Sequence, residues 1–266
     1  MQVRERFPSG SRKAEGLVDE KGCRTGKWEE WYDGGPKRSA ATYDRDVLEG
    51  HYVAWHWKGA VMEEGDYAHG RKTGTWTKFD DAGNATESDI FADGHRNGTH
   101  RCWHTNGALK EEGSYLDDQR EGDWRTWYPQ GALQSLRTYS HGDMRGLAAT
   151  WYENGQRWTE VRVLDGVREE MYQIWHENGS VYLQEEYRDG KHVGLTRTWH
   201  PNGKPRSIGA MQGDREKDSR EGPWFYWRED GDLDSHQTGW YAQDWNIRPL
   251  GASESQELMR EVQGPK

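Results

Sequence analysis

The hexapeptide Gly26-Lys27-Trp28-Glu29-Glu30-Trp31 is the stretch that decides the fold, because its pattern returns along the whole chain. It recurs at Gly122-Asp123-Trp124-Arg125-Thr126-Trp127 and at Gly222-Pro223-Trp224-Phe225-Tyr226-Trp227. Between Gly26 and Gly194 the copies begin every 24 residues, with weaker ones at Gly50, Gly74, Gly98, Gly146, Glu170 and Gly194. Such periodicity predicts a repeat architecture in which each unit packs on its neighbours.

Each copy predicts a first β-strand that ends on an aromatic residue and is followed by a glycine. The aromatic row, which we interpret as the structural core of the repeat, comprises Trp31, Trp55, Phe79, Trp103, Trp127, Trp151, Trp175, Trp199 and Trp227. The turn glycines are Gly35, Gly59, Gly83, Gly107, Gly131, Gly155, Gly179, Gly203 and Gly231. Four of them follow an asparagine, and Asn-Gly predicts a hairpin turn because both residues tolerate positive φ.

A second strand in each copy ends on another row of large side chains. These are Tyr43, Tyr67, Phe91, Tyr115, Tyr139, Val163, Tyr187 and Met211. Asp-Gly pairs at Asp93, Asp165 and Asp189 mark a second turn. Because the array shows no sustained helical periodicity, we predict an all-β fold. The expected form is an elongated single-layer antiparallel sheet of tandem β-hairpins, and whether its two Trp rows share a face stays open.

The repeat divides the chain into three segments. Residues 1–25 are interpreted as a degenerate N-terminal capping repeat, 26–245 as a nine-copy array, and 246–266 as a C-terminal tail or capping helix. Ser253 to Gln256 resembles a capping box, so we expect a short helix that covers the edge of the last strand. The charged stretch from Met211 to Glu221 is predicted to be a solvated loop.

Composition narrows the function classes. The net charge of -10 disfavours nucleic acid and anionic membranes as partners and favours a basic protein. We find no long apolar run and no signal-peptide pattern, so a cytoplasmic location is expected. Cys23 and Cys102 lie about three repeats apart, too far for a disulfide, which predicts free thiols.

These motifs resemble the MORN repeat, and most closely its bacterial variant. The pattern is Gly-x-Trp-x-x-Trp-[Tyr/His]-x-Asn-Gly followed by Glu-x-x-Tyr-x-x-Gly, and it is clearest at 151–155 and 175–190. The resemblance extends from residue 26 to about 240. It implies a non-enzymatic protein-binding scaffold, and the bacterial variant includes antitoxins of the YwqK type. An antitoxin or immunity protein that neutralises a basic toxin is therefore one expected function.

The residues directly after the first-strand aromatic row are the candidate protein-binding site. They are Tyr32, His56, His104, Tyr128, Tyr152, His176 and His200. Tyr and His combine contact area with a hydrogen bond, as interface hot spots do. Neighbouring copies should lie about 10 Å apart, whereas zinc ligands lie about 2 Å from one ion, so we predict no metal site in this row.

Catalysis is not expected. The paired glutamates recur from copy to copy, as a solvated strand surface would, and no nucleophile stands at a diagnostic spacing from a base. We therefore predict no catalytic residue and no cofactor. Two alternatives to protein binding stay open: an aromatic-lined module for carbohydrates or lipid headgroups, and a structural, self-assembling array.

Overall fold

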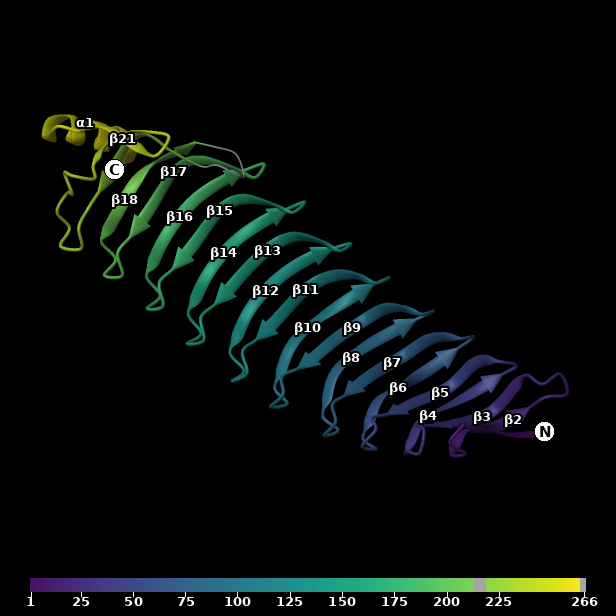
Figure 1. Ribbon diagram of the computed structural model, residues 1–266. Helices are drawn as coiled ribbons and strands as arrows, with labels where there is room; N and C mark the ends of the chain where they lie inside the picture. Colours follow the sequence, from purple (N-terminus) through teal and green to yellow (C-terminus); the bar gives the residue numbers. More distant parts are fainter. Residues whose placement is uncertain (213–218, 264–266) are drawn as a thin grey trace. The chain divides into compact units, whose positions relative to one another are not determined.

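The structure, a computed structural model, describes residues 1–212 and 219–263. It divides into two compact units, Met1–Gly131 (unit 1) and Ala132–Lys266 (unit 2). Each unit is built from hairpins that follow one another in sequence order (Figure 1).

Unit 1 contains eleven strands among its described residues, and each strand pairs antiparallel with the next. Their bounds are β1 Gln2–Arg6, β2 Arg12–Val18, β3 Arg24–Trp31, β4 Lys37–Asp44, β5 Val47–Trp55, β6 Val61–Ala68, β7 Arg71–Phe79, β8 Ala85–Ala92, β9 His95–Trp103, β10 Leu109–Leu116 and β11 Gln119–Trp127.

Unit 2 continues the pattern and adds a helix. Its strands are β12 Leu133–Ser140, β13 Asp143–Trp151, β14 Arg157–Leu164, β15 Val167–Trp175, β16 Val181–Arg188, β17 Lys191–Trp199, β18 Pro205–Gln212, β19 Ser219–Tyr226, β20 Gly239–Ala242 and β21 Trp245–Pro249, followed by α1 Ala252–Gln263. The predicted all-β class, the single layer of tandem antiparallel hairpins and the short C-terminal helix are confirmed.

The Asn-Gly hairpins are real, but their turn is not the predicted one. At Asn106-Gly107 only the glycine has positive φ (82°). Its N–H donates to the carbonyl of His104 (2.9 Å), and the N–H of His104 donates to Ala108 (2.8 Å). This is a three-residue loop, in which a tight turn is completed by one left-handed residue. In the first copy the left-handed residue is Gly34 (63°), not the predicted Gly35.

The opposite end of each repeat carries the turn with two left-handed residues. Both central residues have positive φ at Arg45-Asp46, His69-Gly70, Asp93-Gly94, Asp117-Asp118, His141-Gly142, Asp165-Gly166, Asp189-Gly190 and Gln243-Asp244. This two-residue turn matches the twist of the flanking strands. Where aspartate replaces the second glycine, its carboxylate accepts the N–H of an arginine one repeat earlier, as Asp118 does from Arg96 (2.9 Å).

Acid should weaken the turn at Asp118. Hydrogen bonds from the Arg96 backbone and from His95 hold the pKa of this carboxyl below its ordinary value. Its contribution is therefore present above the unfolded-state pKa of about 4 and is lost as pH falls through the folded value. Urea midpoints of wild type and Asp118→Asn, measured from pH 2 to 6, should converge at low pH. Parallel curves over that range would contradict this expectation.

The glycine that opens each repeat sits at a bulge. Around Gly50 the register shifts from Ala41↔Tyr52 to Tyr43↔Leu48, and Gly50 has φ 80°. The corresponding residue in the seventh copy is Glu170, and it has φ 59°. The backbone therefore keeps its left-handed bend there although a side chain is present, which is unfavourable for an ordinary L-residue.

Glu170→Gly should stabilise the protein by about 1 kcal/mol, because glycine relieves the left-handed strain. The ion pair of Glu170 with Arg162 (3.2 Å) is mostly exposed on both sides and offsets little of this gain. Thermal unfolding of the variant should show a higher midpoint. A lower midpoint would mean that the strain at this position is negligible.

The two Trp rows lie on opposite faces of the strands. The first Trp of a copy lies flat on a glycine of the preceding strand: a Cβ on Gly65 would lie 2.4 Å from the Trp76 ring. The same stacking occurs for Gly16 with Trp28, Gly113 with Trp124, and Gly209 with Trp224. Strand alternation places the second Trp, three residues later, on the other side. We call these sides the first-Trp face and the ladder face.

Copies without the first Trp also lack the glycine beneath it. Tyr52 faces Ala41, His100 faces Asp89, and Ala148 faces Arg137. Each Trp that does stack also donates its indole N–H to the backbone beyond the glycine, at Leu17 (2.8 Å), Asp66 (3.0 Å), Ser114 (3.2 Å) and Ala210 (2.9 Å). The pair thus fills space and satisfies the only polar atom of the ring.

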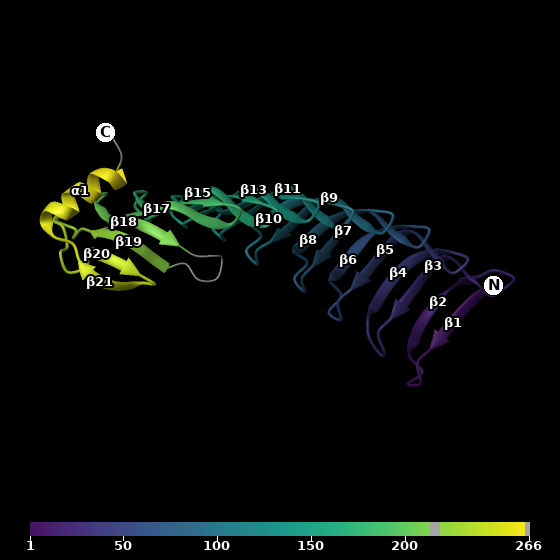
Figure 2. The same ribbon diagram turned by 90° about the horizontal axis from the view of Figure 1, so that it is seen from above.

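We predicted that the C-terminal helix would cover the outer edge of the last strand, but α1 lies elsewhere. Figure 2 shows it alongside β18 and β19, where Leu258 and Met259 pack against the buried Ile208 and Phe225. Apolar burial on this face outweighs edge protection. Strand β21 is exposed along its length. Of the predicted loop Met211–Glu221, residues 213–218 lie outside the described residues, and its two ends belong to β18 and β19.

Candidate functional site

In each unit the ladder face carries half-buried rings at one constant position of the repeat. These rings, the Trp ladder of each unit, are Trp31, Trp55, Phe79, Trp103 and Trp127 in unit 1, and Trp151, Trp175, Trp199 and Trp227 in unit 2. Several rings sit opposite the first residue of the next strand, for example Trp55 opposite Val61 and Trp103 opposite Leu109. A regular row of aromatic and aliphatic side chains that are partly exposed to solvent is typical of a surface that binds another molecule.

The last ladder residue, Trp227, already packs against other side chains of the same protein. Trp227 packs against the cluster of Ile208, Phe225 and Leu250, to which α1 contributes Leu258 and Met259. A cavity of about 160 Å³ lies beside it, lined in part by Trp199, Pro205 and Trp227. The ladder face of unit 2 can therefore accept an apolar helix.

The predicted row after the ladder forms hydrogen bonds from repeat to repeat. The side chains of Tyr32, His56, His104, Tyr152, His176 and His200 bond to the carbonyl of the next ladder residue, at 2.9, 2.9, 2.8, 2.9, 3.0 and 2.8 Å respectively. Since a carbonyl only accepts, each histidine must donate from Nε2. Tyr128 also has an interaction. The row therefore holds successive ladder residues in place, and its proposed contact with a partner remains a prediction.

The asparagine side chains of the loops also form hydrogen bonds from one repeat to the next. Asn178 accepts the Ser180 N–H (3.0 Å) and donates to the Pro201 carbonyl one repeat later (2.8 Å). Asn106, Asn154 and Asn202 do the same. This explains why asparagine precedes the turn glycine although its own φ is not positive.

Tyr152→Phe should lower stability by about 1 kcal/mol, because it removes one hydrogen bond to the Trp175 carbonyl and little else. The matched control is Tyr182→Phe, which leaves this interrepeat bond intact. Chemical unfolding of both variants measures the difference. Equal stability of Tyr152→Phe and wild type would remove the structural role assigned to this row.

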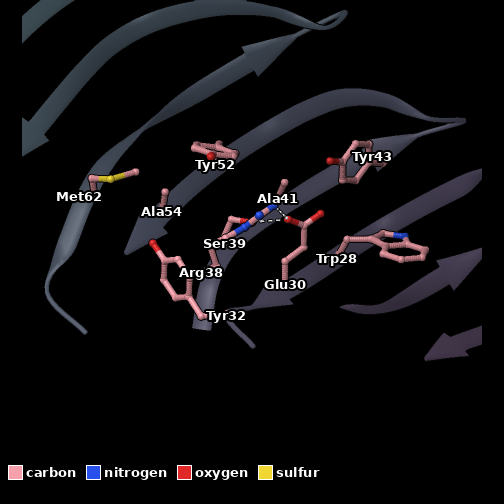
Figure 3. Close-up of a pocket in the computed structure, with 10 residues that line it drawn as sticks. All are labelled: Trp28, Glu30, Tyr32, Arg38, Ser39, Ala41, Tyr43, Tyr52, Ala54 and Met62. Carbon is pink, nitrogen blue, oxygen red and sulfur yellow. Dashed lines mark hydrogen bonds and ion pairs between the residues drawn. The ribbon is translucent and has the colours of Figure 1, made fainter. Parts of the chain in front are cut away.

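The first-Trp face of unit 1 contains a pocket of about 380 Å³ (Figure 3). It opens where Ala41 and Ala54 leave room between larger neighbours. Glu30 and Arg38 form an ion pair across it, and the Ser39 hydroxyl donates to Glu30 (3.2 Å). The lining residues are Trp28, Glu30, Tyr32, Arg38, Ser39, Ala41, Tyr43, Tyr52, Ala54 and Met62.

Cations lie over the rings of this face. Arg24 stands 4.0 Å from the Tyr43 ring centre, Lys72 3.6 Å from Trp76, and Arg96 3.9 Å from Tyr115. The aromatic surface here is therefore largely satisfied by the chain's own basic side chains. Basic side chains lie over ladder rings as well, with Arg12 over Trp31, Lys37 over Trp55, and Arg157 near both Trp151 and Trp175.

A charged cluster interrupts the first-Trp face in the fourth copy. His100 donates to Asp89 through Nδ1 (2.7 Å), and its Nε2 lies 3.6 Å from Glu111. Burial disfavours the charged ring, but these two carboxylates outweigh it and raise the pKa of His100 to about 9. A histidine that stays protonated at neutral pH is poorly suited to act as a general base. Sequence reasoning missed this cluster because its members stand on different strands.

Comparison with known families supports a MORN repeat protein. Residues 96–117 and 120–141 match the family model described as MORN repeat variant. These segments are two consecutive copies of the hairpin described above. No curated protein matches the chain.

Solved structures give only remote likenesses. The chain aligns with "Crystal Structure of TcdB2-TccC3" at 10% identity and a TM-score of 0.21, over 92% of this chain and 15% of that one. "Crystal Structure of TcdB2-TccC3 without hypervariable C-terminal region" aligns at 11% identity and 0.19, over 95% and 16%. The chain thus spans less than a fifth of the length of either.

Within the described residues, α1 is the sole helix, and it is too short and too polar to span a bilayer.

Proposed function

We propose that this protein is a non-enzymatic repeat scaffold whose Trp ladder binds a protein partner. The observation that carries the proposal is the packing of α1: the last ladder residue, Trp227, already contributes to the seat of an apolar helix. The preceding ladder rings repeat the same half-buried arrangement. A partner segment with an apolar stripe would bury them as α1 buries Phe225.

Charge supports a basic partner. The net charge of -10 would speed the capture of a cationic protein and would make the association sensitive to salt. Within this proposal the protein acts as an antitoxin or immunity protein that occupies the working surface of a basic toxin. The row from Tyr32 to His200 holds the ladder in place through its bonds to the ladder carbonyls, and its rings offer a further surface to a partner.

The test compares two folded variants with the wild type. Trp103→Lys places a positive charge on the ladder, whereas Leu116→Lys places one on an exposed leucine away from it. Proteins captured from the producing cells are identified, purified and titrated calorimetrically at low and high salt. Loss of binding in Trp103→Lys alone supports the ladder. Equal binding by all three proteins contradicts it, and growth on co-expression with the partner tests the antitoxin role.

A second candidate is binding of a sugar ring or lipid headgroup in the pocket of Figure 3. Tyr43, Tyr52 and Trp28 offer ring faces, and Glu30 and Arg38 offer polar contacts. Titration with a panel of oligosaccharides and phospholipid vesicles, compared with Tyr52→Ala, tests it. Absence of any signal that this variant removes would leave protein binding as the one function proposed.

A further inference from the structure

The cluster around His100 is the strongest departure from the repeat pattern. In the copies on either side, Gly65 lies under Trp76 and Gly113 lies under Trp124. Between them the same pair is Asp89 and His100. Exchanging a packed indole for an aspartate and a histidine, which are only 6% and 7% exposed, sacrifices apolar burial and places charges inside. The ion pair between His100 and Asp89 (2.7 Å) offsets part of this cost.

Potential metal ligands surround this pair on three adjacent strands. Glu87 precedes Asp89 by two residues on β8 and therefore shares its face. Cys102 bears the same relation to His100 on β9, and it pairs with Glu87 on one side and with Glu111 of β10 on the other. Histidine, carboxylate and thiol side chains thus converge from neighbouring strands.

The distances suit one small cation. Ligand atoms of Glu87, Asp89 and His100 all lie within 4.8 Å of one another. Glu111 faces the other ring nitrogen, Nε2, at 3.6 Å, so water would complete the coordination of an ion held by these three residues. Zinc binds nitrogen and oxygen ligands at about 2.0–2.2 Å, so small side-chain rotations would enclose the ion.

The close approach of two carboxylates is part of the same geometry. Carboxylate oxygens of Glu87 and Asp89 lie within 4.8 Å of each other. Two carboxylates at this distance repel unless a proton or a cation lies between them. Lys78 pairs with Glu87 (3.2 Å), Arg120 with Glu111 (3.6 Å) and His100 with Asp89 (2.7 Å), so a bound Zn²⁺ would take the place of the proton on His100.

We propose that Glu87, Asp89 and His100, with water completing the coordination, form a site for a divalent transition-metal ion of the zinc class. An imidazole among carboxylates favours Zn²⁺ or Co²⁺ over Mg²⁺ and Ca²⁺, which prefer all-oxygen sites. The ion joins β8 and β9 within unit 1. It adds no step to the proposed partner binding, and it stands independently of that proposal.

The test titrates the whole protein with ZnCl₂ by calorimetry and follows thermal unfolding. One Zn²⁺ per chain should bind, and the unfolding midpoint should rise with its concentration. Co²⁺ should give the visible absorption of a tetrahedral site, and a sulfur charge-transfer band would add Cys102 to the ligands. The control His51→Gln alters an exposed histidine–carboxylate pair and should bind as the wild type does.

Two variants make the result decisive. His100→Gln should weaken Zn²⁺ binding at least tenfold, although it also leaves Asp89 without its partner. The double variant Asp89→Gly with His100→Trp restores the pair of the neighbouring repeats, so it should fold and show no Zn²⁺-dependent rise in midpoint. Equal binding by the double variant, or no binding by the wild type, would overturn the proposal.

Discussion

Gly65→Ala should destabilise unit 1 by about 1–3 kcal/mol although it adds a single methyl group. The added Cβ would lie 2.4 to 2.6 Å from atoms of the Trp76 ring, which is only 4% exposed and held by its bond to the Asp66 carbonyl. The ring cannot move away without breaking that bond. Because the φ of Gly65 is not left-handed, backbone strain does not contribute.

The reverse change tests the same contact. Trp76→Ala should cost about 3–5 kcal/mol, since it empties the space above Gly65. Combining the two substitutions should cost less than their sum, because the new methyl group enters the vacated space. Gly251→Ala serves as the control, since a Cβ there meets nothing within 4 Å. Denaturant unfolding of the four proteins completes the cycle, and strict additivity would refute the stacking account.

This stacking shows where sequence reasoning stopped. The hairpins followed from spacing alone, because glycine and asparagine mark turns whatever lies beside them. By contrast, the sequence alone did not distinguish Gly65 and Gly113, which each follow two glutamates, from ordinary strand residues. A signal was present: Trp76 and Trp124 each have a glycine at the facing position, while Tyr52 and His100 have alanine and aspartate. Reading that signal requires the register between strands.

For a related reason, the sequence analysis assigned the two-residue turn to the wrong end of the repeat. Asn-Gly was expected to supply two left-handed residues, but the loop has three residues, and the asparagine side chain binds the next repeat instead. The actual two-residue turns include Asp117-Asp118, which lacks glycine. There the carboxylate compensates through its bond from Arg96. Loop length, and not residue type, distinguishes the two ends.

The predicted binding row has a structural role that its sequence pattern did not indicate. The row from Tyr32 to His200 was chosen because its residues are amphipathic, and they do use a polar tip and a ring. Their polar tips, however, bond to the ladder carbonyls. The cluster at His100 could not be found from spacing, since Glu87, His100 and Glu111 come together only through cross-strand pairing.

Phe225→Ala should be among the most damaging single changes in unit 2, at about 3–5 kcal/mol. Phe225 is 0% exposed, it lies beside its cross-strand partner Ile208, and Leu258 and Met259 of α1 pack against the cluster that these residues form. Its truncation removes the seat of the helix as well as the ring itself. Trp245→Ala, at a ring that is 77% exposed, should change stability little.

Hydrogen exchange separates local from global loss in the Phe225 variant. In a repeat array each unit contacts only its neighbours, so damage should stay near the substituted copy. We expect amides of α1, β18 and β19 to lose protection, while those of β3 to β9 keep it. Uniform loss throughout unit 1 would mean that the helix seat stabilises the whole chain. Unchanged protection of α1 would mean that Leu258 and Met259 hold the helix without Phe225, and that the ladder face does not need this anchor to bind it.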